Sequence, residues 1–225
     1  MRRWLILAAL LLASPVDAQE VDFLLTNGKL PIDDFYHLVA CRALPGRGCT
    51  NEMIRWSPDS ARDLRVGFAP VPPDYPPQLA RSMSTALDAA IVEINGAAAA
   101  LHLGRAVKGE VPPITIHLSP AMDGQPIRGT GIRDIDGTPI GAALVTVWWD
   151  DLNHITDAVI VMAADLPKDE VLPVILEELC QAMGLLTDIR NPVYNAVSVF
   201  SEDSNSVKRL GAQDRAALRL HYPQD

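Results

Sequence analysis

One stretch, residues 171–188, carries the side chains best suited to chemistry. It reads V-L-P-V-I-L-E-E-L-C-Q-A-M-G-L-L-T-D. At about 100° per residue, Glu177, Glu178 and Gln181 fall in one wedge of a helix, opposite a broad apolar face. Gly184 is placed to end this helix or let it pack closely. The stretch therefore predicts a core helix that presents two carboxylates and an amide together.

The rest of this helix is predicted to be buried. Asp169 is the expected N-cap, and Pro173 falls in the first turn, where its missing N–H costs little. An alternative interpretation leaves the polar wedge as a solvated rim without chemistry. The side chains expected on the apolar face are Leu172, Ile175, Leu176, Leu179, Met183 and Leu186.

The pattern E-E-x-x-Q-x-x-G-x-x-T-D resembles the zinc-binding helix of the metzincin peptidases, H-E-x-x-H-x-x-G-x-x-H/D. In that family two histidines bind zinc, the glutamate is the base, and the glycine turns the chain towards a third ligand. Glu177 and Gln181 stand at the histidine positions. Glu178 stands at the base and Gly184 at the glycine. The resemblance thus implies a zincin-like frame without the zinc-binding histidines.

The third ligand position falls on Thr187, with Asp188 beside it. Because zinc favours imidazole and thiolate donors, we expect no zinc and no other cofactor. Glu177, Gln181 and Asp188 are candidate weak ligands for a hard cation such as calcium or magnesium, which is the alternative. The five histidines are scattered, and none has a partner at ligand spacing. They are His37, His102, His117, His154 and His221.

The order of predicted elements agrees with a metzincin catalytic domain. Strands are expected at 64–68, 114–118, 141–149 and 157–163, with a long helix at 77–103 and a final helix near 213–220. This order predicts an α+β (α/β-like) domain: a mixed, twisted sheet backed by two long helices, with a C-terminal helix. The final helix resembles that of the matrixin-type members, and Ser198-Val199-Phe200 falls where those enzymes place a tight turn.

A second resemblance is closer and implies no activity. The motifs F-Y-x-x-V-A-C, at 35–41, and E-E-L-x-Q-x-x-G-L, at 177–185, look like those of an uncharacterised bacterial family of exported proteins and lipoproteins. That family is known only as a domain of unknown function.

The first residues predict export. Residues 1–18 combine two arginines, a short apolar run and a small-residue end, which is typical of a signal peptide cleaved after Ala18. We therefore expect a periplasmic or secreted protein without a stable membrane anchor. Residues 19–56 are predicted to form an extension with a disulfide loop, stapled to a zincin-like domain at 57–225. A net charge of −9 without a basic stripe argues against nucleic-acid partners.

The cysteines fit the same compartment. Cys41 and Cys49 flank the turn-rich segment R-A-L-P-G-R-G, and a pair so placed in an exported protein predicts a disulfide. Cys180 has no partner and no identifiable base, so we expect a buried free thiol rather than a nucleophile.

The predicted edge strand offers a further candidate contact. In the metzincins the matching strand binds extended substrate, so Trp148 and Trp149 are candidates to line a groove. Alternation along a strand sends one of the two tryptophans inward and the other outward. At most one of them is therefore expected to contact a ligand.

Two functions remain open from the sequence. The first is a non-catalytic binding or structural module of the cell envelope, with an unknown protein or peptide partner. The second is a hydrolase or peptidase with a carboxylate-based metal site and Glu178 as general base. Adjacent helical glutamates diverge, so an acid/base pair would need another carboxyl, from Asp188, Glu202 or Asp203.

Overall fold

A computed structural model describes residues 23–107 and 109–224. The predicted signal peptide, with its cleavage site, lies outside these residues. Within them, no helix is both long and apolar enough to cross a membrane. The helices are α1 (Ile32–Cys41), α2 (Pro58–Ala61), α3 (Pro77–Asn95), α4 (Val171–Ala182) and α5 (Ala212–His221), with a 3-10 turn at Pro192–Tyr194.

Six strands form the main sheet. They are β2 (Arg55–Trp56), β3 (Leu64–Phe68), β4 (Leu103–Arg105), β5 (Ile114–Leu118), β6 (Ala143–Trp149) and β7 (His154–Met162). The central order is β4-β3-β5-β7-β6, and β2 pairs with the beginning of β7. Every pairing is parallel except β6 with β7. The predicted mixed sheet is therefore confirmed, with an antiparallel strand at one edge.

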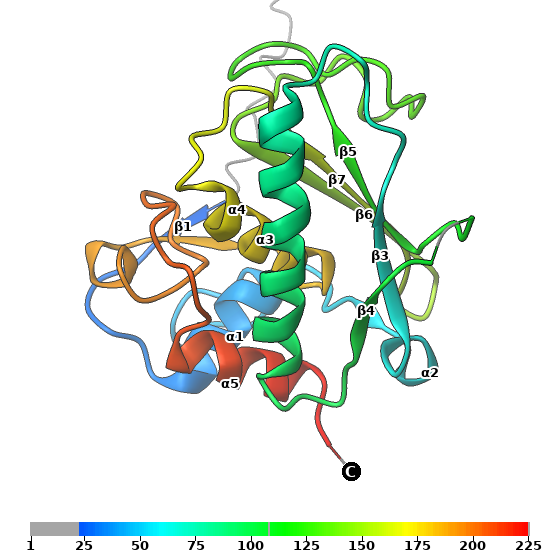
Figure 1. Cartoon of the computed structure of the whole chain (residues 1–225). Helices are drawn as coiled ribbons and strands as arrows, with labels where there is room; N and C mark the ends of the chain where they lie inside the picture. Colours follow the sequence, from blue (N-terminus) through cyan, green and yellow to red (C-terminus); the bar gives the residue numbers. More distant parts are fainter. Residues whose placement is uncertain (1–22, 108, 225) are drawn as a thin grey trace, which may run out of the picture.

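The alternating side chains of β7 separate two layers of core. Ala158, Ile160 and Met162 pack into the main core with α3 and α4, and these two helices lie beside each other (Figure 1). Val159 and Val161 point the other way, into a small cluster closed by the long 119–142 loop. Strand β7 thus carries an apolar run because both of its faces are buried.

The segment before residue 57 belongs to the same core. Strand β1 (Phe23–Leu25) pairs in parallel with β8 (Asp188–Arg190), and α1 packs against α5. Phe35 and Trp56 are both almost fully buried. The disulfide between Cys41 and Cys49 closes a loop inside this segment. Packing and strand pairing, rather than the disulfide, therefore attach the predicted extension to the rest of the chain.

Helix α4 differs from its prediction at its N-terminal end and in the burial of some side chains. Glu170 rather than Asp169 is the N-cap, and its side chain makes no capping hydrogen bond. Leu172 is only half-buried, whereas Glu178 is buried. Glu178 and Gln181 are both buried, so the alternative interpretation of a solvated rim does not describe this side of the helix.

Candidate functional site

A groove of about 610 Å³ separates the edge strand β6 from helix α4. One wall is the stretch from Gly141 to Val147, and the opposite wall is the polar side of α4. All the residues of the predicted frame except the glycine line it: Glu177, Glu178, Gln181, Thr187 and Asp188. The structure therefore gathers the residues that the sequence motif singled out.

Gln181 and Asp188 form the contact that joins α4 to β8. The side-chain amide of Gln181 donates to both carboxylate oxygens of Asp188, over 3.1 and 3.2 Å. Both residues are buried. Thr187 also lines the groove, and its backbone N–H donates to the Val39 carbonyl over 3.2 Å. Asp188, rather than Thr187, is thus the side chain that meets the helix.

The turn that brings Asp188 back to α4 depends on Gly184. Its φ of 97° lies in the region that only glycine adopts readily. A side chain there would overlap the Ile54 carbonyl and approach the His221 ring. This explains in physical terms why the motif has glycine three residues after Gln181.

Glu202 reaches the groove through the segment that follows the 3-10 turn. Ile189 of β8 donates its N–H to the Phe200 carbonyl over 2.7 Å, and Glu202 donates its N–H to the Ile189 carbonyl over 3.2 Å. The Glu202 carboxylate accepts from Arg190 over 3.0 Å. Main-chain pairing with β8 therefore places a further carboxylate beside Asp188.

The Ser198–Phe200 turn is anchored by a buried aspartate of α5. Asp214 accepts hydrogen bonds from the Ser198 hydroxyl at 2.6 Å and from the Val199 and Gly211 N–H groups at 3.1 and 2.8 Å. Burial raises the pKa of the Asp214 carboxyl, and these hydrogen bonds lower it. Asp214 thereby connects the C-terminal helix to the segment that leads to Glu202.

Electrostatics set Glu177 apart within the groove. Burial raises the pKa of its carboxyl well above the usual value, and the negative charges of Asp188, Glu178 and Glu202 raise it further. Among the described residues, none forms a hydrogen bond or ion pair with its side chain. Glu177 is therefore a carboxylate that is costly to ionise where it stands.

The free edge of β6 faces outward along the other wall. Ala163 donates its N–H to the Ala142 carbonyl. Hydrogen-bonded pairs alternate along an antiparallel ladder, so Leu144 and Thr146 are the next residues of β6 that exchange hydrogen bonds with β7. It follows that Ala143, Val145 and Val147 direct their N–H and C=O groups away from β7. Among the described strands, β6 pairs with β7 alone. The groove is thus bordered by backbone groups that can accept another strand.

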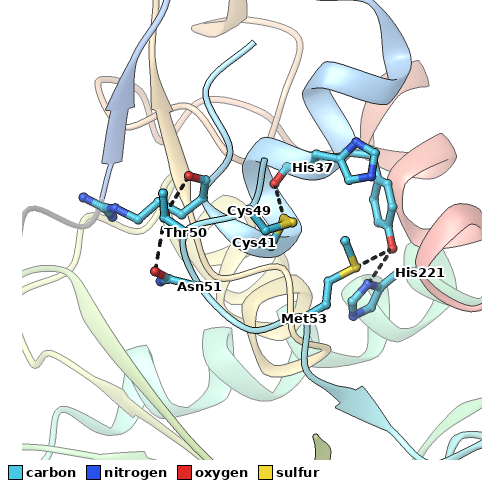
Figure 2. Close-up of a disulfide and its surroundings, with 9 residues drawn as sticks. His37, Cys41, Cys49, Thr50, Asn51, Met53 and His221 are labelled. Carbon is cyan, nitrogen blue, oxygen red and sulfur yellow. Dashed lines mark hydrogen bonds between the residues drawn. A yellow bond between two sulfur atoms is a disulfide. The ribbon is translucent and has the colours of Figure 1, made fainter. Parts of the chain in front are cut away.

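The segment around the disulfide supplies a further part of the wall. Arg42 and Asn51 both line the groove. Thr50 and Asn51 donate their N–H groups to the Cys41 carbonyl, each over 3.1 Å, and the Thr50 hydroxyl donates to the Arg42 carbonyl over 2.9 Å. Figure 2 shows this loop folded back beside the Cys41–Cys49 bond. The disulfide therefore fixes the segment that carries two groove residues.

Three other predicted residues lie apart from the groove lining. Trp148 packs against the small cluster behind the sheet, and Trp149 is exposed. The contribution of β6 to the groove ends at Val147, so neither tryptophan lines it. Cys180 is free and fully buried, and burial raises the pKa of its thiol well above the usual value. A protonated, enclosed thiol is not a nucleophile.

The donor set does not fit zinc. Zinc sites in proteins are built mainly from imidazole and thiolate donors, and the groove offers carboxylates and an amide. The side-chain amide nitrogen of Gln181 points towards Asp188 and donates a hydrogen bond to its carboxylate. In the described parts of the chain, no three histidine, cysteine or acidic side chains gather where they can hold a metal ion.

Sequence reasoning missed the contributions of Arg42, Asn51 and Asn205 to the groove. Arg42 and Asn51 belong to the segment predicted as an N-terminal extension, and Asn205 follows the irregular 3-10 region. No local pattern marks such positions, because their proximity to α4 arises only from long-range packing.

Comparison with protein families adds a match over part of the chain. Residues 133–225 match the model of a family described as a protein of unknown function (DUF2927). The matched region includes β6, β7, α4, β8 and α5, and therefore the E-E-L-x-Q-x-x-G-L motif. It agrees with the predicted resemblance to a domain of unknown function and brings no activity. No curated protein matches the chain.

Proposed function

We propose that the chain is an exported, zincin-like binding module of the cell envelope that holds an extended polypeptide segment in the β6–α4 groove without cleaving it. The observation that carries this proposal is the groove itself, bordered on one side by an edge strand with outward N–H and C=O groups. An extended segment that joins a sheet edge gains main-chain hydrogen bonds whatever its sequence.

Two further observations support the zincin-like part of the proposal. The antiparallel edge strand lies beside the helix that carries the metzincin-like motif, and Gly184 turns the chain so that Asp188 meets Gln181. The donor chemistry supports binding rather than catalysis, because the positions that hold zinc in metzincins carry oxygen donors.

Export is supported by two features of different kinds. Residues 1–18 have the composition of a signal peptide. The Cys41–Cys49 disulfide is the kind of bond that persists in an oxidising compartment. A periplasmic or secreted location follows as part of the proposal.

Selection of random linear decapeptides on the immobilised protein tests the binding function. Selected peptides are expected to bind the wild-type chain and to lose affinity for Val145→Pro, which removes an outward N–H without breaking the ladder to β7. The control is Val111→Pro, at a position that is 91% exposed and outside the groove lining. Circular dichroism of both variants checks that they fold.

The outcome against the proposal is equally defined. Peptides that bind the folded Val145→Pro variant as tightly as the wild type would place binding elsewhere. Mass spectrometry of the selected peptides after incubation, with and without magnesium, calcium or zinc, separates the two functions predicted from sequence. Intact peptides support the binding module. Cleavage that depends on Glu178 would favour the hydrolase.

A further inference from the structure

Strand addition along β6 uses only main-chain groups of the ligand, so it gives no role to the carboxylate of Glu177, which also lines the groove. Its carboxyl is half-buried and lies close enough to Asp188, Glu178 and Glu202 for their charges to raise its pKa. Mutual repulsion of carboxylates in a sheltered site disfavours ionisation of all of them. A cation brought into this position would relieve that repulsion.

The neighbouring carboxylates already have partners of their own. Asp188 accepts from the amide of Gln181, and Glu202 accepts from Arg190. Glu177 has no hydrogen bond or ion pair with any residue in the described chain. The lining of the groove holds four acidic residues and one basic residue, Arg42. The charge of the groove is therefore complementary to a positively charged ligand.

We infer that the groove selects an extended segment bearing a lysine or arginine, whose side chain extends from the edge of β6 towards Glu177. This inference rests on the proposed function and specifies its ligand. Strand addition fixes the backbone of the segment along Ala143–Val147, and side chains of a strand alternate between its two faces. Those on one face point towards α4. A lysine or arginine carries its charge at the end of a long apolar stem.

Apolar side chains in the groove can pack against the methylene groups of a lysine or arginine. Val145 and Val147 pack on the same side as the main core, and Val174 and Leu186 also line the groove. A basic side chain can therefore pack its methylene groups against these residues while its charged end meets Glu177. An acidic side chain in the same place would face like charges and would be rejected.

The selected decapeptides test this inference directly. Their sequences are expected to share lysine or arginine at one position, and replacing that residue by norleucine is expected to weaken binding by at least about tenfold. The same loss is expected when the original peptide is tested on Glu177→Gln. Glu52→Gln is the control, because Glu52 is exposed and lies outside the groove lining.

The results that contradict the basic-ligand inference differ from those that contradict the proposed function. Peptides that bind in a Val145→Pro-sensitive manner but lack a shared basic residue, or tolerate norleucine and Glu177→Gln, would overturn the basic-ligand inference alone. Binding that is insensitive to Val145→Pro would overturn the proposed function as well. If Glu177→Gln binds the norleucine peptide as tightly as the wild type does, the variant has kept its groove, and its loss of the lysine peptide reports the missing charge.

Discussion

At the scale of single residues, Glu177 links the groove to pH. Its pKa in the folded chain lies above the usual 4.5, so the folded state holds this proton more tightly than the unfolded chain does. Below the usual value the carboxyl is protonated in both states. As pH rises through the folded pKa, ionisation is penalised in the folded state, and stability is lost.

Glu177→Gln is therefore expected to stabilise the protein at neutral pH, because glutamine resembles the protonated glutamate. The melting temperature should rise by several degrees at pH 7 and match that of the wild type well below pH 4.5. Thermal melts across this range check the prediction, with Glu52→Gln as the exposed control. A variant less stable than the wild type at neutral pH would show that the ionised carboxylate stabilises the fold.

Gly184 forms the turn that brings Asp188 back to Gln181. Its positive φ turns the chain after α4 towards Asp188. The absence of a side chain leaves room for the Ile54 carbonyl. Gly184→Ala is expected to cost more than about 3 kcal/mol, since both backbone strain and overlap oppose it.

Urea denaturation measures this cost, and Gly48→Ala provides the matched control. Gly48 has open space at its would-be Cβ and no positive φ, so its substitution should change stability by less than about 0.5 kcal/mol. Similar unfolding midpoints for the two variants would mean that the turn after α4 has room to rearrange.

At the scale of elements, the sequence predicted what local patterns encode. The strand at 114–118 was predicted with its exact bounds, and α4 was predicted from its apolar spacing. The long helix ends at Asn95, before the predicted residue 103, because residues 96–102 turn the chain into β4. Strands of two or three residues, such as β1 and β8, escaped prediction because their pairing depends on segments far apart in the chain.

The candidate site divides in the same way. Glu177, Gln181 and Asp188 of the motif line one groove, and they could be named from the sequence because helical spacing and a glycine turn are local properties. The contribution of Arg42 depends on the loop closed by the disulfide, which no pattern in α4 indicates. The tryptophans were placed on the expected strand but beyond the end of the groove.

At the scale of the whole molecule, one arrangement unites the mixed sheet, the motif-bearing helix and the disulfide segment. The edge of β6, the polar side of α4 and the loop with Arg42 and Asn51 enclose a single acidic groove. Carboxylates and an amide line this groove, and we propose that it binds an extended, basic segment.

Amide hydrogen exchange on the complex with a selected peptide tests this assignment most directly. Ala143, Val145 and Val147 direct their N–H groups outward, whereas Leu144 and Thr146 already donate within the ladder to β7. Strand addition predicts that the peptide slows exchange at the outward residues, while Leu144 and Thr146, protected already, change little. Unchanged exchange at Ala143, Val145 and Val147 in the saturated complex would contradict the account.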